Sequence, residues 1–184
     1  MSPRTKKILT TIAIVLGGLF FVYKLADMFS TGSYGHAEEY ELNYPEDKVI
    51  EAITELKNSD SGLKVPKVTI QNSGQYELDD GKQKESDHIY KFYFYDKKSN
   101  KILFTWTRPS GRKTTTFAFV SINDGLDLGH WKDVNDDFGS LENGEILKDF
   151  EVTILERIKR NLESNKYSED GAAHSIGYKS CRHG

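Results

Sequence analysis

The sequence predicts an α+β domain of two layers, in which a mainly antiparallel sheet of about four to five strands carries two helices on one face. Three observations indicate this fold. Short runs of alternating apolar and polar residues predict strands. Two longer stretches carry an apolar stripe at helical spacing. An apolar run at the start of the chain, Ile8–Tyr23, is flanked by lysines and predicts a single N-terminal transmembrane helix ahead of the domain.

This apolar run is predicted to be an uncleaved signal anchor covering residues 1–29. Ile8–Tyr23 contains neither a charge nor a proline, and apolar residues continue beyond it. A cleaved signal peptide is the main alternative, and a hydrophobic core helix is the third. The small residues that cleavage requires first occur at Gly35 and Ala37, too far from the apolar run. We therefore expect the lipid bilayer as a partner.

The orientation follows from charge asymmetry. Arg4, Lys6 and Lys7 precede the run, and no acid occurs before Tyr23. The positive-inside rule then places the N-terminus in the cytoplasm and the domain in the periplasm or outside the cell. The chain of 184 residues has a formal net charge of −3, so removing these three positive charges leaves −6 on the remainder. An acidic domain does not favour a phosphate backbone, and nucleic acid is not an expected partner.

The chain after the apolar run begins with a tether. Residues 30–39 are rich in Ser and Gly, which predicts a flexible segment, and the globular domain is predicted over residues 40–164. Residues 40–44 alternate as a half-buried strand does. Pro45 then starts a helix, because proline suits the first helical position and two acids follow it. The apolar stripe of this helix contains Val49, Ile50, Ile53 and Leu56.

The middle of the domain is predicted to be strands. A strand is expected at residues 64–70, and residues 88–124 read as three strands joined by two tight turns, at 98–100 and 109–112. Asn100 is expected in the left-handed conformation. The expected core face carries Phe92, Phe94, Ile102, Phe104, Trp106, Phe117 and Phe119. The expected solvated face carries Thr105, Thr107, Thr114 and Thr116.

The last helix is predicted within residues 143–164 and is expected to cover the apolar face of the sheet. Its apolar residues recur at helical spacing. They are Leu147, Phe150, Ile154, Ile158 and Leu162. Residues 165–184 have little apolar periodicity and are predicted to form a disordered tail. Cys181 is the single cysteine of the chain, so that the core rather than a disulfide must hold the fold.

Candidate binding residues are few. His130 and Trp131 follow the last predicted strand at the end of the sheet, where a ligand pocket can form, although a Trp that plugs the core edge is the favoured interpretation. Tyr93 and Tyr95 are expected on the outer face of the sheet, where they offer a surface for a protein partner. No residue pattern indicates catalysis, and no cofactor is expected.

One loop resembles a calcium-binding pattern. Asp133, Asn135 and Asp137 occupy its first, third and fifth positions, but Phe138 stands where the tight-turn glycine is required and Gly144 where the bidentate glutamate is required. Asx-rich turns ahead of a helix are common without metal. We therefore expect a capped loop rather than a calcium site.

Two functions follow from these observations. The first is a membrane-anchored extracytoplasmic interaction or binding domain that meets a protein partner at the membrane. The alternative is a binder of a small hydrophobic ligand, or an enzyme, with a cavity between the sheet and the helices near His130 and Trp131. An enzyme is the less favoured of the two classes. A cavity lined by polar groups as well as aromatic rings favours the ligand binder, whereas a packed interior excludes it.

Overall fold

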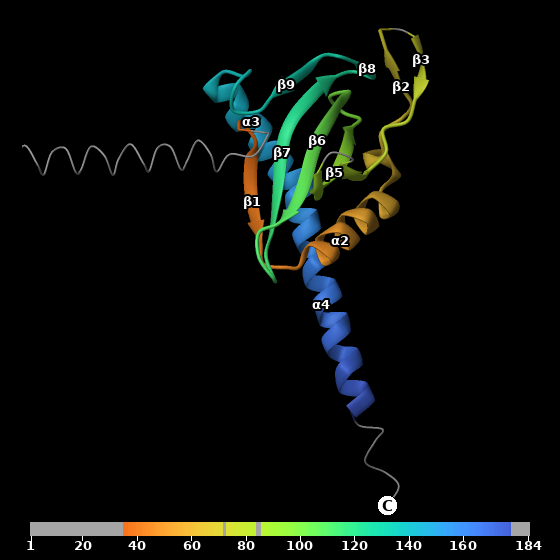
Figure 1. Ribbon diagram of the computed structural model, residues 1–184, viewed down its shortest axis with the longest axis vertical. Coiled ribbons are helices and arrows are strands. Elements are labelled where there is room, and N and C mark those ends of the chain that lie inside the picture. Colours follow the sequence, from red (N-terminus) through yellow and green to blue (C-terminus); the bar gives the residue numbers. More distant parts are fainter. Residues whose placement is uncertain (1–34, 72, 84–85, 178–184) are drawn as a thin grey trace, which may run out of the picture. The chain divides into compact units, whose positions relative to one another are not determined.

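The computed structural model describes residues 35–71, 73–83 and 86–177 of the chain. The chain divides into two units, of which the second is His36–Gly184. The second unit is an α+β domain with a mainly antiparallel sheet against which helices pack (Figure 1). The α+β class predicted from the sequence is confirmed.

The main sheet is formed by β1 (Glu38–Leu42), β4 (Gly81–Gln83), β5 (Ser86–Asp96), β6 (Lys101–Pro109), β7 (Thr115–Asp124) and β9 (Trp131–Asp133). Among the described residues, five of these strands lie in the order β1-β7-β6-β5-β4, and β9 also pairs with β7. All of these pairings are antiparallel. The two consecutive hairpins of β5, β6 and β7 confirm the three strands predicted over residues 88–124.

A smaller sheet contains β2 (Val68–Ile70), β3 (Ser73–Tyr76) and β8 (Asp127–Leu128). β2 pairs antiparallel with β3 and parallel with β8. The strand predicted at residues 64–70 therefore forms over its last three residues, and it belongs to a separate sheet. Pro66 precedes the strand, which is consistent with the absence of a donor N–H on proline.

Helix α2 (Glu46–Ser59) begins directly after Pro45, as the sequence predicts. Its predicted apolar stripe faces the core, with Val49 and Ile53 fully buried. A 3-10 turn, η1 (Ser61–Leu63), follows the helix.

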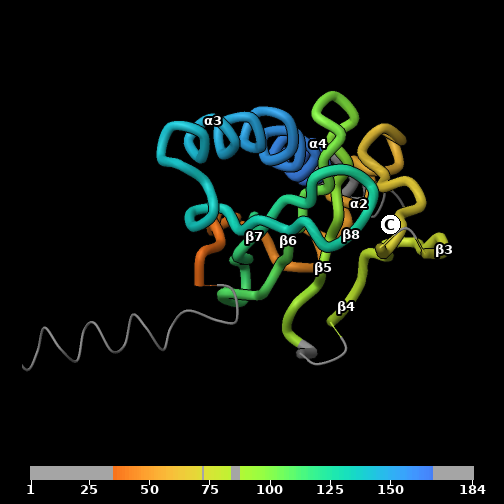
Figure 2. The backbone as a smooth tube through the Cα atoms, turned by 90° about the horizontal axis from the view of Figure 1, so that it is seen from above, coloured from red at the N-terminus to blue at the C-terminus, as the bar shows by residue number. Residues whose placement is uncertain are grey.

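The C-terminal helix consists of α3 (Ser140–Phe150), the π-helical turn η2 (Glu151–Leu155) and α4 (Glu156–Gly177). Figure 2 shows α3 and α4 along one side of the main sheet. Four of the five apolar residues predicted for this helix are at most 2% exposed: Phe150, Ile154, Ile158 and Leu162. α4 continues to Gly177, into the range for which the sequence predicts a disordered tail.

The turn between β5 and β6 contains four residues rather than the predicted three. Asp96 pairs with Lys101, and Asn100 has the predicted left-handed conformation, with φ of 55°. The carboxylate of Asp96 accepts hydrogen bonds from the backbone N–H of Lys98 at 2.9 Å and from the hydroxyl of Ser99. These bonds form an Asx turn that accommodates the extra residue. The predicted register of this hairpin is therefore wrong by one position.

A shift of one residue moves every side chain of a strand to the other face of the sheet. Phe92 pairs with Thr105, and Phe94 pairs with Leu103, all on the face that the helices cover. Thr105 and Thr107 are thus fully buried rather than solvated. The residues that were expected in the helix-covered core but that lie on the opposite face are Ile102, Phe104 and Trp106.

The β6–β7 hairpin also departs from prediction. Its turn contains residues 110–114, one residue more than expected. Thr105 of β6 pairs with Phe119, and the preceding residue, Phe104, pairs with Ser121. Val120 is therefore the extra residue of a β-bulge. The bulge changes the phase of β7. Phe119 and Ile122, three residues apart, consequently both belong to the core beneath the helices.

The predicted membrane anchor lies outside the described residues, as do residues 30–34 of the predicted tether. Strand β1 starts at Glu38, so that the end of the predicted tether is ordered as a strand. Within the described ranges, no helix combines the length and the apolar character needed to cross a bilayer.

Candidate functional site

A cleft of about 540 Å³ opens between the main sheet and the C-terminal helix. Leu103 of β6 and Phe119 and Ile122 of β7 form its floor, and Phe150 and Ile154 form one wall. The wall coincides with the start of η2. A π-helical turn is wider than an α-helical turn and is found frequently at functional sites. The cleft therefore lies where the helical cover of the sheet is irregular.

An aromatic stack holds this wall in place. The ring of Phe150 stacks on Phe119, with centroids 4.2 Å apart, and lies 5.9 Å from Phe117 and 6.0 Å from Tyr40. Burial raises the pKa of the Tyr40 hydroxyl well above its usual value, and the nearby carboxylate of Glu151 adds to the rise. Tyr40 therefore remains neutral beside the stack. The wall of the cleft is thus built on a rigid, apolar base.

An ion pair lies on the rim of the cleft. Nη2 of Arg157 on α4 donates to Oδ2 of Asp60 at 2.8 Å, and the other carboxylate oxygen of Asp60 accepts from the backbone N–H of Gly62 at 3.0 Å. The hydrogen bond from Arg157 lowers the pKa of Asp60. The pair connects the end of α2 to α4. Because both side chains are about one-third exposed, this bond orients the rim more than it stabilises the fold.

The rim as a whole is close to electrically neutral. Its positive residues are Lys97, Lys98, Lys101 and Arg157, and its negative residues are Asp60, Asp96, Glu145 and Asp149. Equal numbers of both signs surround an apolar floor. Such a site favours a ligand that is mainly apolar and has little net charge, because a strongly charged ligand finds no excess of the opposite sign.

His130 and Trp131 do not line this cleft. They lie on the opposite side of the sheet, where β9 pairs with the end of β7. The Trp131 ring is 6.2 Å from Phe104 and 6.3 Å from Tyr93, and the Tyr93 ring stacks on Phe104 at 5.2 Å. The backbone N–H of His130 donates to Oδ1 of Asn123 at 2.9 Å. The structure therefore brings Tyr93 and Trp131 together in an aromatic cluster away from the cavity.

Tyr95, by contrast, is among the residues that line the cleft. Its hydroxyl donates to Oδ1 of Asn100 at 2.9 Å, which closes the β5–β6 turn. Of the four predicted binding residues, Tyr95 is thus the one that the structure places at the cavity.

The calcium-like loop forms hydrogen bonds within itself. Oδ2 of Asp137 accepts from the backbone N–H of Asp133 at 2.7 Å, and Asn135 exchanges two hydrogen bonds with Asn143. Asn135 also has a left-handed φ of 64° and donates to Glu38 at 2.9 Å. Across the part of the chain that the structure describes, no group of three or more His, Cys, Asp or Glu side chains is arranged to hold a metal ion.

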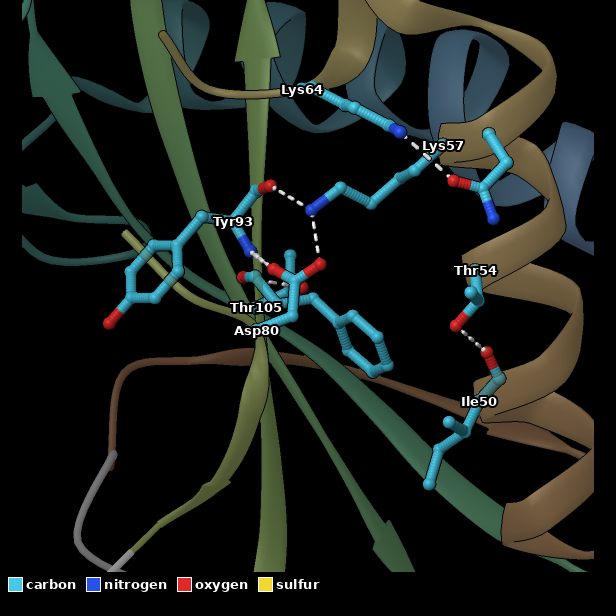
Figure 3. A network of polar contacts seen from close by, with 9 residues as sticks. Ile50, Thr54, Lys57, Lys64, Asp80, Tyr93 and Thr105 are labelled. Carbon is cyan, nitrogen blue, oxygen red and sulfur yellow. Dashed lines mark hydrogen bonds and ion pairs between the residues drawn. The ribbon is translucent and has the colours of Figure 1, made fainter. Parts of the chain in front are cut away.

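A partly buried ion pair fixes the segment ahead of β4 against the sheet (Figure 3). The ammonium group of Lys57 on α2 donates to Oδ2 of Asp80 and, at 2.8 Å, to the carbonyl oxygen of Tyr93. Oδ1 of Asp80 accepts from the backbone N–H of Tyr93 at 2.9 Å. Both backbone groups of Tyr93 at this edge of β5 are therefore satisfied by side chains. This network positions Tyr93 through two residues that are distant from it in the sequence.

The sequence offered a cavity between the sheet and the helices as an alternative but, apart from Tyr95, did not identify the residues of this cleft, because they come from distant segments. One local signal was present. Phe150, Ile154, Ile158 and Leu162 recur at every fourth residue, and such a repeat rotates by about 40° per step around an α-helix of 3.6 residues per turn. A π-helical turn absorbs part of that rotation. A strict four-residue spacing therefore indicates an irregular turn, and η2 occurs within this repeat.

No protein-family model, curated protein or solved structure matches this chain. The proposed function therefore rests on the fold and the cleft of the described domain.

Proposed function

We propose that this chain is a membrane-anchored binding protein whose extracytoplasmic domain takes a small, mainly apolar ligand in the cleft between the sheet and η2. The observation that carries the proposal is the cleft itself. Its volume of about 540 Å³ falls within the range of small-molecule sites, and an apolar floor is combined with charged groups of both signs at the mouth. Binding, rather than catalysis, fits a rim whose Asp60 and Arg157 are paired with each other.

Contacts among the outer-face side chains also favour a ligand binder over a protein-interaction surface on that face. The aromatic residues of that face pack on one another, with Tyr93 and Trp131 both half-buried against Phe104. The hydroxyl of Tyr95 is bonded within its own turn. These contacts use the side chains that a partner would otherwise contact.

The anchor is part of the proposal. The apolar run of residues 8–23, preceded by three positive charges, supports a single-pass topology with the N-terminus in the cytoplasm and the domain on the other side of the membrane. Tethering at a bilayer places the cleft near a source of apolar small molecules. A ligand of little net charge is the kind that partitions into such a bilayer.

The test is to identify small molecules that co-purify with the full chain from native membranes, using mass spectrometry of the extracted protein. The variant Thr153→Phe places a ring at the cleft, because Thr153 lines it. The matched control is Val152→Phe, since the neighbouring Val152 is 61% exposed and does not line the cleft. We expect a small apolar molecule to be retained by the wild type and by the control, and to be lost from Thr153→Phe. Equal recovery from all three proteins, or recovery from none, would refute the proposal.

A further inference from the structure

A second concavity lies at the other end of the domain, where the chain passes from β1 to α2. This groove of about 720 Å³ is bounded by that connection, by the β6–β7 turn and by α4. Figure 1 shows these three segments meeting where α4 passes the end of the sheet. The apolar residues of the groove are Leu42, Tyr44, Pro45 and Leu162.

The rim of this groove carries an excess of positive charge. Four lysines line it together with two glutamates, Glu41 and Glu163, so that the rim has a net charge of +2. The lysines come from three segments: Lys48 from α2, Lys113 from the β6–β7 turn, and Lys159 and Lys166 from α4. The chain beyond the N-terminal basic residues carries −6. The groove is therefore a local positive site on an acidic domain.

Lys113, Lys159 and Lys166 are accessible to a ligand, whereas Lys48 pairs with Glu51 at 3.2 Å. Lys113 and Lys166 are exposed and form no ion pair with any residue in the described ranges. Lys159 pairs at 3.2 Å with Glu156, one turn away on the same helix, and both side chains are about half exposed. Exposed pairs of this kind contribute little free energy, so that an incoming anion competes with them at small cost.

We propose that this groove binds a single-chain amphipathic carboxylate of the fatty-acid type. The acyl chain lies along the partly exposed Tyr44 and Pro45, above the buried Leu42 and Leu162, and the carboxylate lies among the lysines. Lysine provides a mobile point charge with three donors rather than the fixed fork of arginine, which suits a small carboxylate at the end of a flexible chain. The lysines surround a concavity with an apolar floor, and this arrangement favours one amphiphile over the flat surface of a bilayer.

This site differs from the proposed ligand cleft in position and in charge. The cleft has a neutral rim and is lined by the β5–β6 turn, α3 and η2, and no residue lines both concavities. A ligand in the groove and a ligand in the cleft therefore contact different segments of the chain, which proteolysis separates. The two proposals can be tested independently in a single experiment.

The experiment uses the full chain in nanodiscs of zwitterionic lipid and a hexadecanoic acid that carries a photoreactive diazirine in its chain. After irradiation, proteolysis and mass spectrometry locate the labelled residues. We expect label in residues 41–48 and 159–166. The methyl ester of the same probe lacks the charge and should label these segments about tenfold less, as should the acid on K113E/K166E, which changes the rim from +2 to −2.

Two further variants separate charge from folding. K67E/K148E makes the same change in net charge at exposed positions outside the groove and should label like the wild type. K113Q/K166Q removes the positive charges without adding negative ones and should give an intermediate result. Equal labelling of the groove by the acid and the ester would overturn the proposal, as would label confined to the cleft residues 145–154. Loss of groove label in K67E/K148E would also overturn it.

Discussion

The partly buried pair of Lys57 and Asp80 leads to a prediction whose magnitude follows from the structure. The side chain of Lys57 is 10% exposed and that of Asp80 is 26% exposed. In Asp80→Ala the ammonium group stays buried and keeps the carbonyl oxygen of Tyr93 as an acceptor, together with the ring of Phe94 at 5.5 Å. Leaving a buried charge without its counter-ion costs about 3–5 kcal/mol, and we expect the lower end because these contacts remain.

The reverse change should cost less. In Lys57→Met, Asp80 keeps the hydrogen bond from the backbone N–H of Tyr93 and is exposed enough to be hydrated. We expect a loss of about 1.5 kcal/mol. The double variant should cost about 2 kcal/mol, well below the sum of the two, since it leaves no unpaired buried charge.

The assay is urea unfolding of residues 36–184, followed by tryptophan fluorescence. Lys64→Met is the control: Lys64 is exposed and donates to Asn58 at 2.9 Å, so that its loss should cost under about 0.5 kcal/mol. If the two single variants cost the same and their effects add, Lys57 and Asp80 are not coupled and this account of the edge of the sheet is wrong.

Three further predictions concern the stack, the rim and the anchor. Phe150→Ala should lower the free energy of unfolding by about 3–5 kcal/mol because it removes the centre of the aromatic stack, whereas Val152→Ala should change it by under about 0.5 kcal/mol; similar losses in urea titrations would contradict this. Because the pKa of Asp60 is lowered in the fold, its contribution is complete above the unfolded value of about 3.9 and is lost as the pH falls through the lower folded value. Asp60→Asn should therefore melt below the wild type at neutral pH, and the gap should close in acid; a constant gap would refute the role of the ion pair. The full chain should resist carbonate extraction from membranes and retain Met1 or Ser2, and a mature N-terminus near Glu38 would show cleavage instead.

The sequence by itself determined the elements whose signals are local. Pro45 and the acids after it start α2, because proline and negative charge both suit the first turn of a helix. Asn100 adopts the left-handed conformation because its side chain tolerates it. The four-residue spacing from Phe150 onward produces a continuous apolar stripe, which must be buried against the sheet. Each of these features depends on neighbouring residues alone.

The tertiary structure decided the register, and with it the two faces of the sheet. In β5 the aromatic residues Phe92 and Phe94 alternate with Tyr93 and Tyr95, and β6 is buried on both faces, so that periodicity does not distinguish the core face from the other. The turn at Asp96 and the bulge at Val120 make that choice. The hydrogen bonds of the turn are local, but the bulge exists only where β7 pairs with β6. The cleft and the groove arise in the same way, from side chains that segments far apart in the sequence bring together.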